Sequence, residues 1–125
     1  MKRQILLGFL LAVAPLSAAA AMPVSTFLTK ADALQKKGAL AVFSGDLKLL
    51  MKQVQSDAAA LREANKAADA AGRRKAYCTP PGGVRLRNQD ILDAMRAVPP
   101  AERARTDTRD ALRSYFARRF PCPQA

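Results

Sequence analysis

The chain contains no histidine, and only two of its 125 residues are cysteines. The absence of histidine excludes a serine–histidine–aspartate triad, a cysteine–histidine nucleophile pair and any histidine-based metal site. Two cysteines alone do not complete a zinc shell. We therefore predict that the protein is not an enzyme, and that it holds neither a metal nor a cofactor.

A pair of carboxylates is a further arrangement with hydrolytic potential, because two such groups can cleave a glycosidic bond. Asp90 and Asp93 stand three residues apart in the first turns of a predicted helix. The helix dipole favours acidic side chains there, so we prefer a structural interpretation. A serine–lysine dyad stays open in principle, although each serine after residue 21 fits a helix cap or a helix surface. The segment "PPGG" lacks the Lys-Ser or Lys-Thr pair of a phosphate-binding loop.

Residues 1–21 have the layout of a cleavable secretory signal peptide. Lys2 and Arg3 form a short positive region, "ILLGFLLAVAPL" is an apolar core, and "SAAAA" supplies the small residues that signal peptidase requires. The apolar run is too short for a retained membrane anchor, and Pro15 interrupts it near its end. The sequence therefore predicts an exported protein, periplasmic or secreted, with a single helical domain over residues 22–125.

Acidic residues are scarce: the chain has 10 of them against 21 lysines and arginines, for a formal net charge of +11. In a cytosolic protein this surplus would suggest nucleic acid as the partner. Export argues against that partner, and the chain shows neither an aromatic-studded sheet pattern nor an arginine-rich recognition helix. The anions that an exported protein meets are lipid headgroups, cell-wall carboxylates and acidic faces of other proteins.

The two cysteines, Cys78 and Cys122, are predicted to form a disulfide bond. An even pair in an oxidising compartment is typically oxidised, and two cysteines allow a single intramolecular pairing. The bond would close a loop of about 45 residues, for which chain entropy predicts a stabilisation of about 4 kcal/mol. A small domain with an alanine-rich core is marginal on burial alone, so this contribution matters.

Apolar residues recur at spacings of three and four along the chain after residue 21, and this period predicts helices. A short helix, "FLTKADALQKKG", is capped by Ser25 or Thr26 and ends at Gly38. A long helix follows, from the N-cap Ser44 to near Gly72. Its apolar stripe consists of Leu47, Leu50, Met51, Val54, Ala58, Leu61, Ala64 and Ala68.

Two more helices are predicted after the loop "YCTPPGGVRLR", whose prolines and glycines exclude a helix. Asn88 caps "QDILDAMRAV", which the following prolines end, and a brief helical turn from Pro100 would add a fifth element. Thr106 or Thr108 caps the last helix, and Pro121 ends it. The predicted fold class is all-α: a small bundle of four to five helices with one long central helix, stapled by one disulfide.

Seven basic residues flank the two cysteines in the sequence: Arg73, Arg74, Lys75, Arg85, Arg87, Arg118 and Arg119. A disulfide bond would gather them around one end of the molecule. One interpretation is a solvated basic surface without a dedicated ligand. The other is an electropositive docking face for an acidic partner, because arginine pairs with a carboxylate through two hydrogen bonds.

The C-terminal half carries a series of motifs in a fixed order. They are Cys78 and Pro80, Gly83 and Val84, a helix from Gln89, Pro100 and Arg103, Ala111 and Leu112, and Phe120-Pro121-Cys122. This series resembles the Rap/Tai family of immunity proteins, small exported helical proteins that protect bacteria from peptidoglycan amidase toxins delivered by type VI secretion. The resemblance implies an exported helical scaffold that binds an amidase. The N-terminal half lacks the further cysteines that family members usually carry, so no toxin-binding loop is carried over.

Together these features predict an exported binding protein without enzymatic activity, an immunity-like inhibitor that docks on a peptidoglycan hydrolase or amidase with an acidic surface. One alternative is a periplasmic stress or chaperone-like protein, although the chain has few groups that titrate between about pH 7 and pH 4. Another is a basic envelope protein that binds anionic cell wall or lipid. A further alternative is that the protein forms a homodimer.

Overall fold

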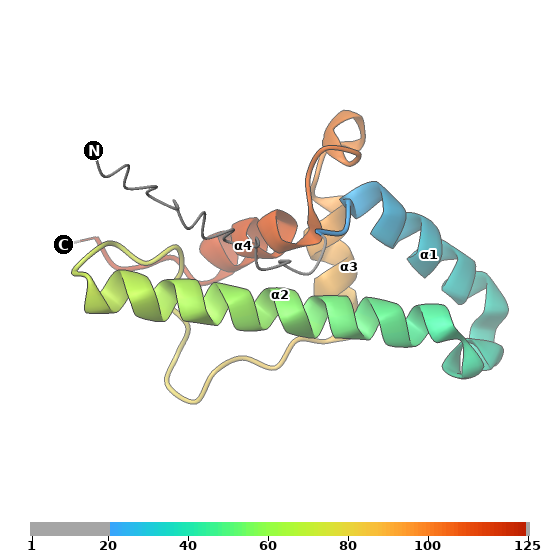
Figure 1. Ribbon diagram of the computed structural model, residues 1–125, viewed down its shortest axis with the longest axis horizontal. Helices are drawn as coiled ribbons and strands as arrows, with labels where there is room; N and C mark the ends of the chain where they lie inside the picture. The colour runs from blue at the N-terminus through green and yellow to red at the C-terminus, as the bar shows by residue number, and fades with distance from the viewer. Residues whose placement is uncertain (1–20, 125) are drawn as a thin grey trace, which may run out of the picture.

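The computed structural model describes residues 21–124, and four α-helices make up most of this part (Figure 1). They are α1 (Val24–Lys37), α2 (Gly45–Ala70), α3 (Asn88–Arg96) and α4 (Thr108–Arg119), with two 3-10 turns, η1 (Gly38–Phe43) and η2 (Pro100–Glu102). Within the described residues, strand-like pairing is limited to an isolated bridge between Pro23 and Asp107. The predicted all-α bundle with one long helix is confirmed. The predicted signal peptide, apart from Ala21, lies outside the described residues.

Helix α2 is the long element along which the other helices are arranged (Figure 1). It begins where the sequence predicts, because the Ser44 side chain accepts a hydrogen bond of 3.2 Å from the Asp46 N–H. Leu50, Val54 and Leu61 are buried along one side. Met51 was predicted in the same stripe but is 54% exposed, since successive residues of a helix are rotated by about 100°.

The core lies where α4 packs against α2 and α3, and where α1 packs against α2 and α3. Each helix contributes fully buried apolar side chains, among them Phe27 from α1, Met95 from α3 and Leu112 from α4. Tyr77, from the loop over residues 71–87, is buried in the same core. Because this loop supplies a core residue, it is fixed to the helices.

Helix α1 begins earlier than the predicted caps Ser25 and Thr26. The N–H of Val24 donates a hydrogen bond to the Thr106 carbonyl, and that of Ser25 donates to the Arg103 carbonyl. These carbonyls, distant in sequence, satisfy first-turn donors that a side-chain cap would otherwise serve. The start of α1 is therefore set by a tertiary contact.

Helix α4 is capped by Asp107, between the two predicted candidates. The Asp107 carboxylate accepts a hydrogen bond of 2.8 Å from the Asp110 N–H. Thr108 is the first helical residue, and its side chain is completely buried. The Thr108 hydroxyl can be buried at little cost because it donates a hydrogen bond to a residue of α2.

That partner is Asp57, a carboxylate whose exposed fraction is only 1%. The Thr108 hydroxyl donates to Asp57 Oδ2 at 2.5 Å, and Gln53 Nε2 donates to Oδ1 at 3.0 Å. Arg109 forms an ion pair with Asp57, with 3.6 Å between Nε and Oδ1. Arg109 Nε is also buried and has no hydrogen-bond partner among the described residues. This polar cluster joins α2 to the start of α4.

The predicted disulfide bond between Cys78 and Cys122 is present, with 4.8 Å between the two Cα atoms. Next to it, the Cys78 N–H donates a hydrogen bond of 2.8 Å to the Phe120 carbonyl. The bond joins residues that are 44 positions apart in the chain. It therefore fixes the 71–87 loop to the segment that follows α4.

We expect Cys122→Ser to lower the melting temperature by on the order of 10 °C, because the unfolded chain regains the freedom that the loop removes. Thermal unfolding followed by circular dichroism measures the shift. Cys78→Ser should cause the same loss, since either substitution removes the same bond. Melting temperatures equal to that of the wild type would contradict the prediction.

Thr108→Val should reduce the free energy of unfolding by about 1–3 kcal/mol, because it leaves the buried Asp57 carboxylate without its shortest hydrogen bond. Thr29→Val is the matched control: Thr29 is exposed, and its hydroxyl bonds only to the Ser25 carbonyl of the same helix. Its effect should stay below about 0.5 kcal/mol. Urea denaturation measures the free energy of unfolding of both variants. Equal losses would show that the hydrogen bond to Asp57 makes no specific contribution to stability.

Candidate functional site

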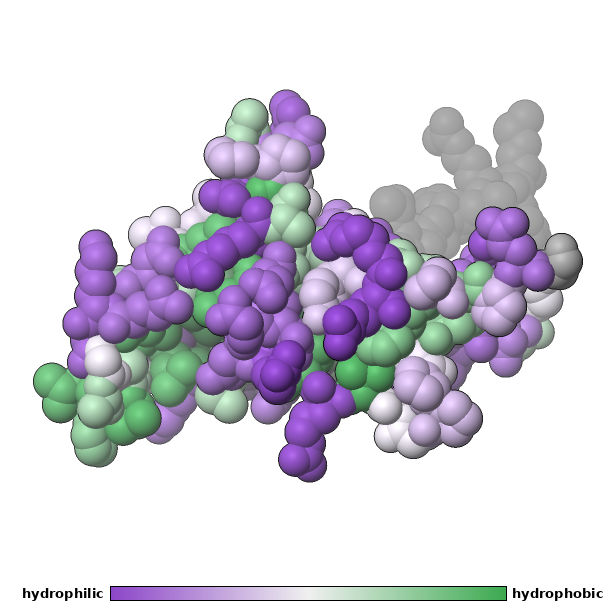
Figure 2. All heavy atoms as spheres, turned by 180° about the vertical axis from the view of Figure 1, so that it is seen from behind, coloured by the Kyte–Doolittle hydropathy of each residue, from purple (hydrophilic) through white to green (hydrophobic). Residues whose placement is uncertain are grey.

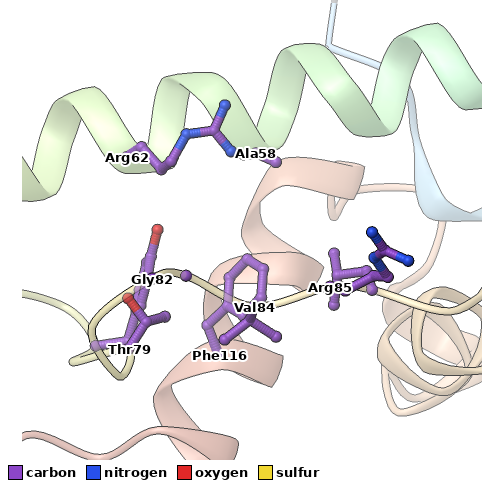
Figure 3. Close-up of a pocket in the computed structure, with 10 residues that line it drawn as sticks. Ala58, Arg62, Thr79, Gly82, Val84, Arg85 and Phe116 are labelled. Carbon is purple, nitrogen blue, oxygen red and sulfur yellow. The ribbon is translucent and has the colours of Figure 1, made fainter.

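An open hollow with a volume of about 590 Å³ lies between α2, the 71–87 loop and α4 (Figure 3). Its lining residues are Ala58 and Arg62 from α2, Phe116 from α4, and Tyr77, Thr79, Gly82, Gly83, Val84, Arg85 and Leu86 from the loop. We call it the Arg62–Arg85 hollow. All three of the segments that build it are held in place by contacts described above.

The floor of the hollow is aromatic and apolar. The Tyr77 and Phe116 rings lie with 4.8 Å between their centroids, and both residues are buried. Burial raises the pKa of the Tyr77 hydroxyl, an effect that the nearby Arg62 charge partly opposes. The phenol is therefore neutral at physiological pH, and the floor carries no negative charge that would repel an acidic ligand.

The loop wall is fixed to α2 by the side chain of Asn65. Asn65 Nδ2 donates to the Tyr77 carbonyl at 2.9 Å, and its Oδ1 accepts from the Ala76 N–H at 3.1 Å. Further along, Gly82 and Gly83 have φ angles of 90° and 81°, in a region that favours glycine. The turn they form carries the loop back along α2 and places Val84 and Arg85 opposite that helix.

Two arginines stand on facing walls of the hollow. Figure 3 shows Arg62 on α2 and Arg85 on the loop opposite. Within residues 21–124, neither arginine forms an ion pair with an acidic side chain at 4.0 Å or less. Their guanidinium groups are thus available to a carboxylate of another molecule, which each could bind through two hydrogen bonds.

The predicted basic face is divided among several places. Arg85 lines the hollow, Arg73 and Arg74 are exposed after the end of α2, and Lys75 is half-buried. Arg118 and Arg119 line a separate shallow depression together with Asp93 and Tyr115. The seventh member, Arg87, precedes α3 and is engaged with Asp90.

Arg62 is not among the seven basic residues predicted to form a docking face, because it lies on the long helix, away from both cysteines in the chain. The only available signal was its position directly after Leu61, at the edge of the apolar stripe. The position of Arg62 in the sequence does not predict that the loop with Arg85 lies opposite α2. The pairing of these two arginines comes from the tertiary structure.

The carboxylates Asp90 and Asp93 have structural partners. Asp90 Oδ2 accepts hydrogen bonds from the Arg87 backbone N–H at 2.9 Å and from its Nε at 3.2 Å, and Oδ1 accepts from the Tyr115 hydroxyl at 3.2 Å. Asp93 accepts a hydrogen bond of 2.7 Å from Gln89 on the same helix. These contacts agree with the structural interpretation of both residues.

The hydrogen bonds from Arg87 lower the pKa of Asp90 from 3.8 to about 2. Asp90 in turn raises the pKa of Arg87, mainly through their hydrogen bond. The pKa of Tyr115 is raised by burial first and by Asp90 second. The hydrogen bonds from Arg87 and Tyr115 stabilise an ionised Asp90, which joins the start of α3 to α4.

Within residues 21–124 no three histidine, cysteine, aspartate or glutamate side chains gather in a way that could hold a metal ion. None of the helices in that part combines the length and hydrophobicity that crossing a membrane requires. The candidate site is the Arg62–Arg85 hollow, on the basis of its lining residues.

Asp90→Asn tests the Arg87–Asp90–Tyr115 contacts through their pH dependence. Because the pKa of folded Asp90 lies below its ordinary value, its contribution to stability is complete above about pH 4 and disappears as the pH falls towards about 2. The difference in melting temperature between wild type and Asp90→Asn should shrink over that interval. Tyr115→Phe should give a smaller difference. A difference that does not change with pH would contradict the assignment.

We compared the chain with protein-family models, with curated proteins and with solved structures. No family model, no curated protein and no solved structure matches it. The function proposed below therefore rests on the residues and geometry of this chain and on the motif resemblance of its C-terminal half.

Proposed function

We propose that this protein is an exported binding protein without enzymatic activity, which inhibits a peptidoglycan hydrolase or amidase by docking on it. The observation that carries the proposal is the Arg62–Arg85 hollow, an apolar floor with an arginine on each of two facing walls. Neither arginine is neutralised by an acidic side chain within the described residues.

Such a hollow suits a protruding loop of a partner protein that carries an acidic side chain beside an apolar one. Arginine and aromatic residues contribute much of the binding energy at protein interfaces, particularly where their contacts are shielded from water. Here Tyr77 and Phe116 offer the apolar surface, and Arg62 and Arg85 offer the charged contacts. The 71–87 loop and α2 would cover a loop of the hydrolase that is held in the hollow. The docked hydrolase would therefore lose access to its substrate.

The motif resemblance supports the same role. Gly83 and Val84, which belong to the series that resembles the Rap/Tai immunity proteins, both line the hollow. Cys78 and Cys122, from the same series, fix the loop that carries them. The motif residues thus surround the place where we propose that the hydrolase binds.

The Asp90 contacts favour the inhibitor over an acid-activated chaperone. A chaperone that loosens in acid needs ion pairs that break as the pH falls towards 4. The hydrogen bonds from Arg87 lower the pKa of Asp90 to about 2, so its carboxylate stays ionised as the pH falls to about 4. This ion pair therefore opposes acid-driven opening between α3 and α4.

The test is a binding assay of the purified protein against a panel of peptidoglycan amidases from type VI secretion systems. Arg85→Glu should weaken the complex by about 100-fold, because it places a negative charge where the partner's carboxylate binds. Arg105→Glu is the matched control, since it reverses the charge of another exposed loop arginine outside the hollow.

Inhibition of muropeptide release should fall in parallel with the affinity. Circular dichroism of both variants checks that the helices are retained. Equal weakening by the two substitutions would exclude the hollow as the docking site. Absence of binding to every amidase in the panel would refute the proposed function itself.

A further inference from the structure

The end of the molecule formed by η1 exposes apolar side chains to solvent. Leu40, Val42 and Phe43 are exposed by 70%, 61% and 85%. Figure 2 shows hydrophobic residues clustered at one end of the molecule, at the lower left of that view. We call these three residues the apolar tip; Leu49 and Met51, in the first turns of α2, extend the exposed apolar surface.

The fold does not require these side chains to be apolar. None of the three belongs to the core, and within η1 only Ala41 packs against it. A turn between two helices is ordinarily polar, because exposed apolar side chains add nothing to stability and promote association. Three large apolar residues grouped on one protruding turn therefore indicate a surface that is covered by something outside the chain.

Four lysines flank the apolar tip along the chain. Lys36 and Lys37 end α1, and Lys48 and Lys52 lie in the first two turns of α2; all four are exposed. Within residues 21–124 none of the four forms an ion pair, whereas nearby Lys30 is paired with Asp46 at 3.0 Å. The tip is thus an apolar cluster with unpaired lysines on the helical segments that precede and follow it.

The type of cation differs between the segment that carries the tip and the Arg62–Arg85 hollow. Every basic residue in the segment 22–61 is a lysine, whereas the Arg62–Arg85 hollow has arginines. Arginine suits the bidentate pairing of a carboxylate on a protein. Lysine is a compact charge on a flexible apolar stem, which can follow mobile headgroups while its methylene groups stay against apolar surface.

We propose that the apolar tip inserts into the headgroup and upper acyl region of an anionic lipid bilayer, with the four lysines against the lipid phosphates. Amphipathic surfaces of this composition bury their apolar side by roughly 5–10 Å at the interface. Charge complementarity favours an anionic bilayer over a second copy of this chain, because two such tips would bring eight lysines together.

This contact leaves the protein-docking site free. Arg62 lies about 20 Å further along the α2 axis than Lys48, taking the ordinary rise of a helix. A chain held at a membrane by its tip would therefore present the Arg62–Arg85 hollow away from the lipid. The inference does not depend on the proposed function, since it uses different residues at the other end of α2.

Direct insertion can be measured with a single indole, because the chain contains no tryptophan. Phe43→Trp should show a blue shift in its emission with vesicles of phosphatidylethanolamine and phosphatidylglycerol, and none with phosphatidylcholine alone. Ala104→Trp places the indole in the exposed turn after η2, away from the tip, and should show no shift with either. A blue shift from both positions, or from neither, would overturn the proposal.

Vesicle sedimentation of the protein as purified after export separates tip insertion from general charge attraction. Phe43→Ser should lower the partition onto phosphatidylglycerol-containing vesicles by about tenfold, and Phe43→Leu should restore it. Lys36→Gln with Lys37→Gln should lower the partition by about thirtyfold at low salt. The matched control, Arg73→Gln with Arg74→Gln, removes the same charge from the opposite end of α2.

Equal losses in the two double variants would show that the net charge of the chain, not the tip, binds the vesicles, and would overturn the proposal. So would a wild-type chain that forms dimers in sedimentation velocity which Phe43→Ser dissolves, because the occupant would then be a second copy. Binding that persists in Phe43→Ser would exclude insertion. All variants carry the same N-terminal segment, so any contribution from it is common to every comparison.

Discussion

The covalent bond between Cys78 and Cys122 fixes the position of the segment on which the candidate site depends. The 71–87 loop contains no helix, and it contributes most of the residues that line the Arg62–Arg85 hollow. The loop is held at one point by the disulfide and the adjacent backbone hydrogen bond to Phe120, and at another by Asn65 on α2. Because the helices bury many small side chains, packing alone would hold this loop weakly. The geometry of the hollow therefore depends on the Cys78–Cys122 bond as much as on the packing of the loop against the helices.

A second constraint, the buried Asp57 cluster, holds α4 against α2. Replacing only one partner of a buried polar contact leaves the other unsatisfied, so such contacts specify one arrangement of the helices. Thr108 and Arg109 meet Asp57 at the start of α4, while the disulfide acts after its end. Helix α4, which has 12 residues, is thus fixed at both ends, and this holds Phe116 in place in the lining of the Arg62–Arg85 hollow.

The sequence was informative where a cap acts within one turn or where only one pairing was possible, although the cap of α4 was misplaced by one residue. Ser44 marks the start of α2 because an N-cap acts within one turn, and the two cysteines could pair only with each other. It was uninformative where a distant segment decides the outcome. Val24 begins α1 because carbonyls some eighty residues later accept its first hydrogen bonds. Asp57 reads as a surface residue until Thr108 is placed beside it, and Arg62 acquires its role only from the loop opposite.

The disulfide also makes the protein's form depend on where the chain is. In a reducing compartment the two thiols stay separate, since glutathione and thioredoxin systems keep them so. The 71–87 loop then loses its covalent anchor, and the facing arginines lose their fixed spacing. The reduced chain is accordingly looser around this loop, and oxidation of the two thiols restores the fixed spacing. The shape of the Arg62–Arg85 hollow thus depends on the redox state of the chain's surroundings, because the bond that fixes its loop forms only under oxidising conditions.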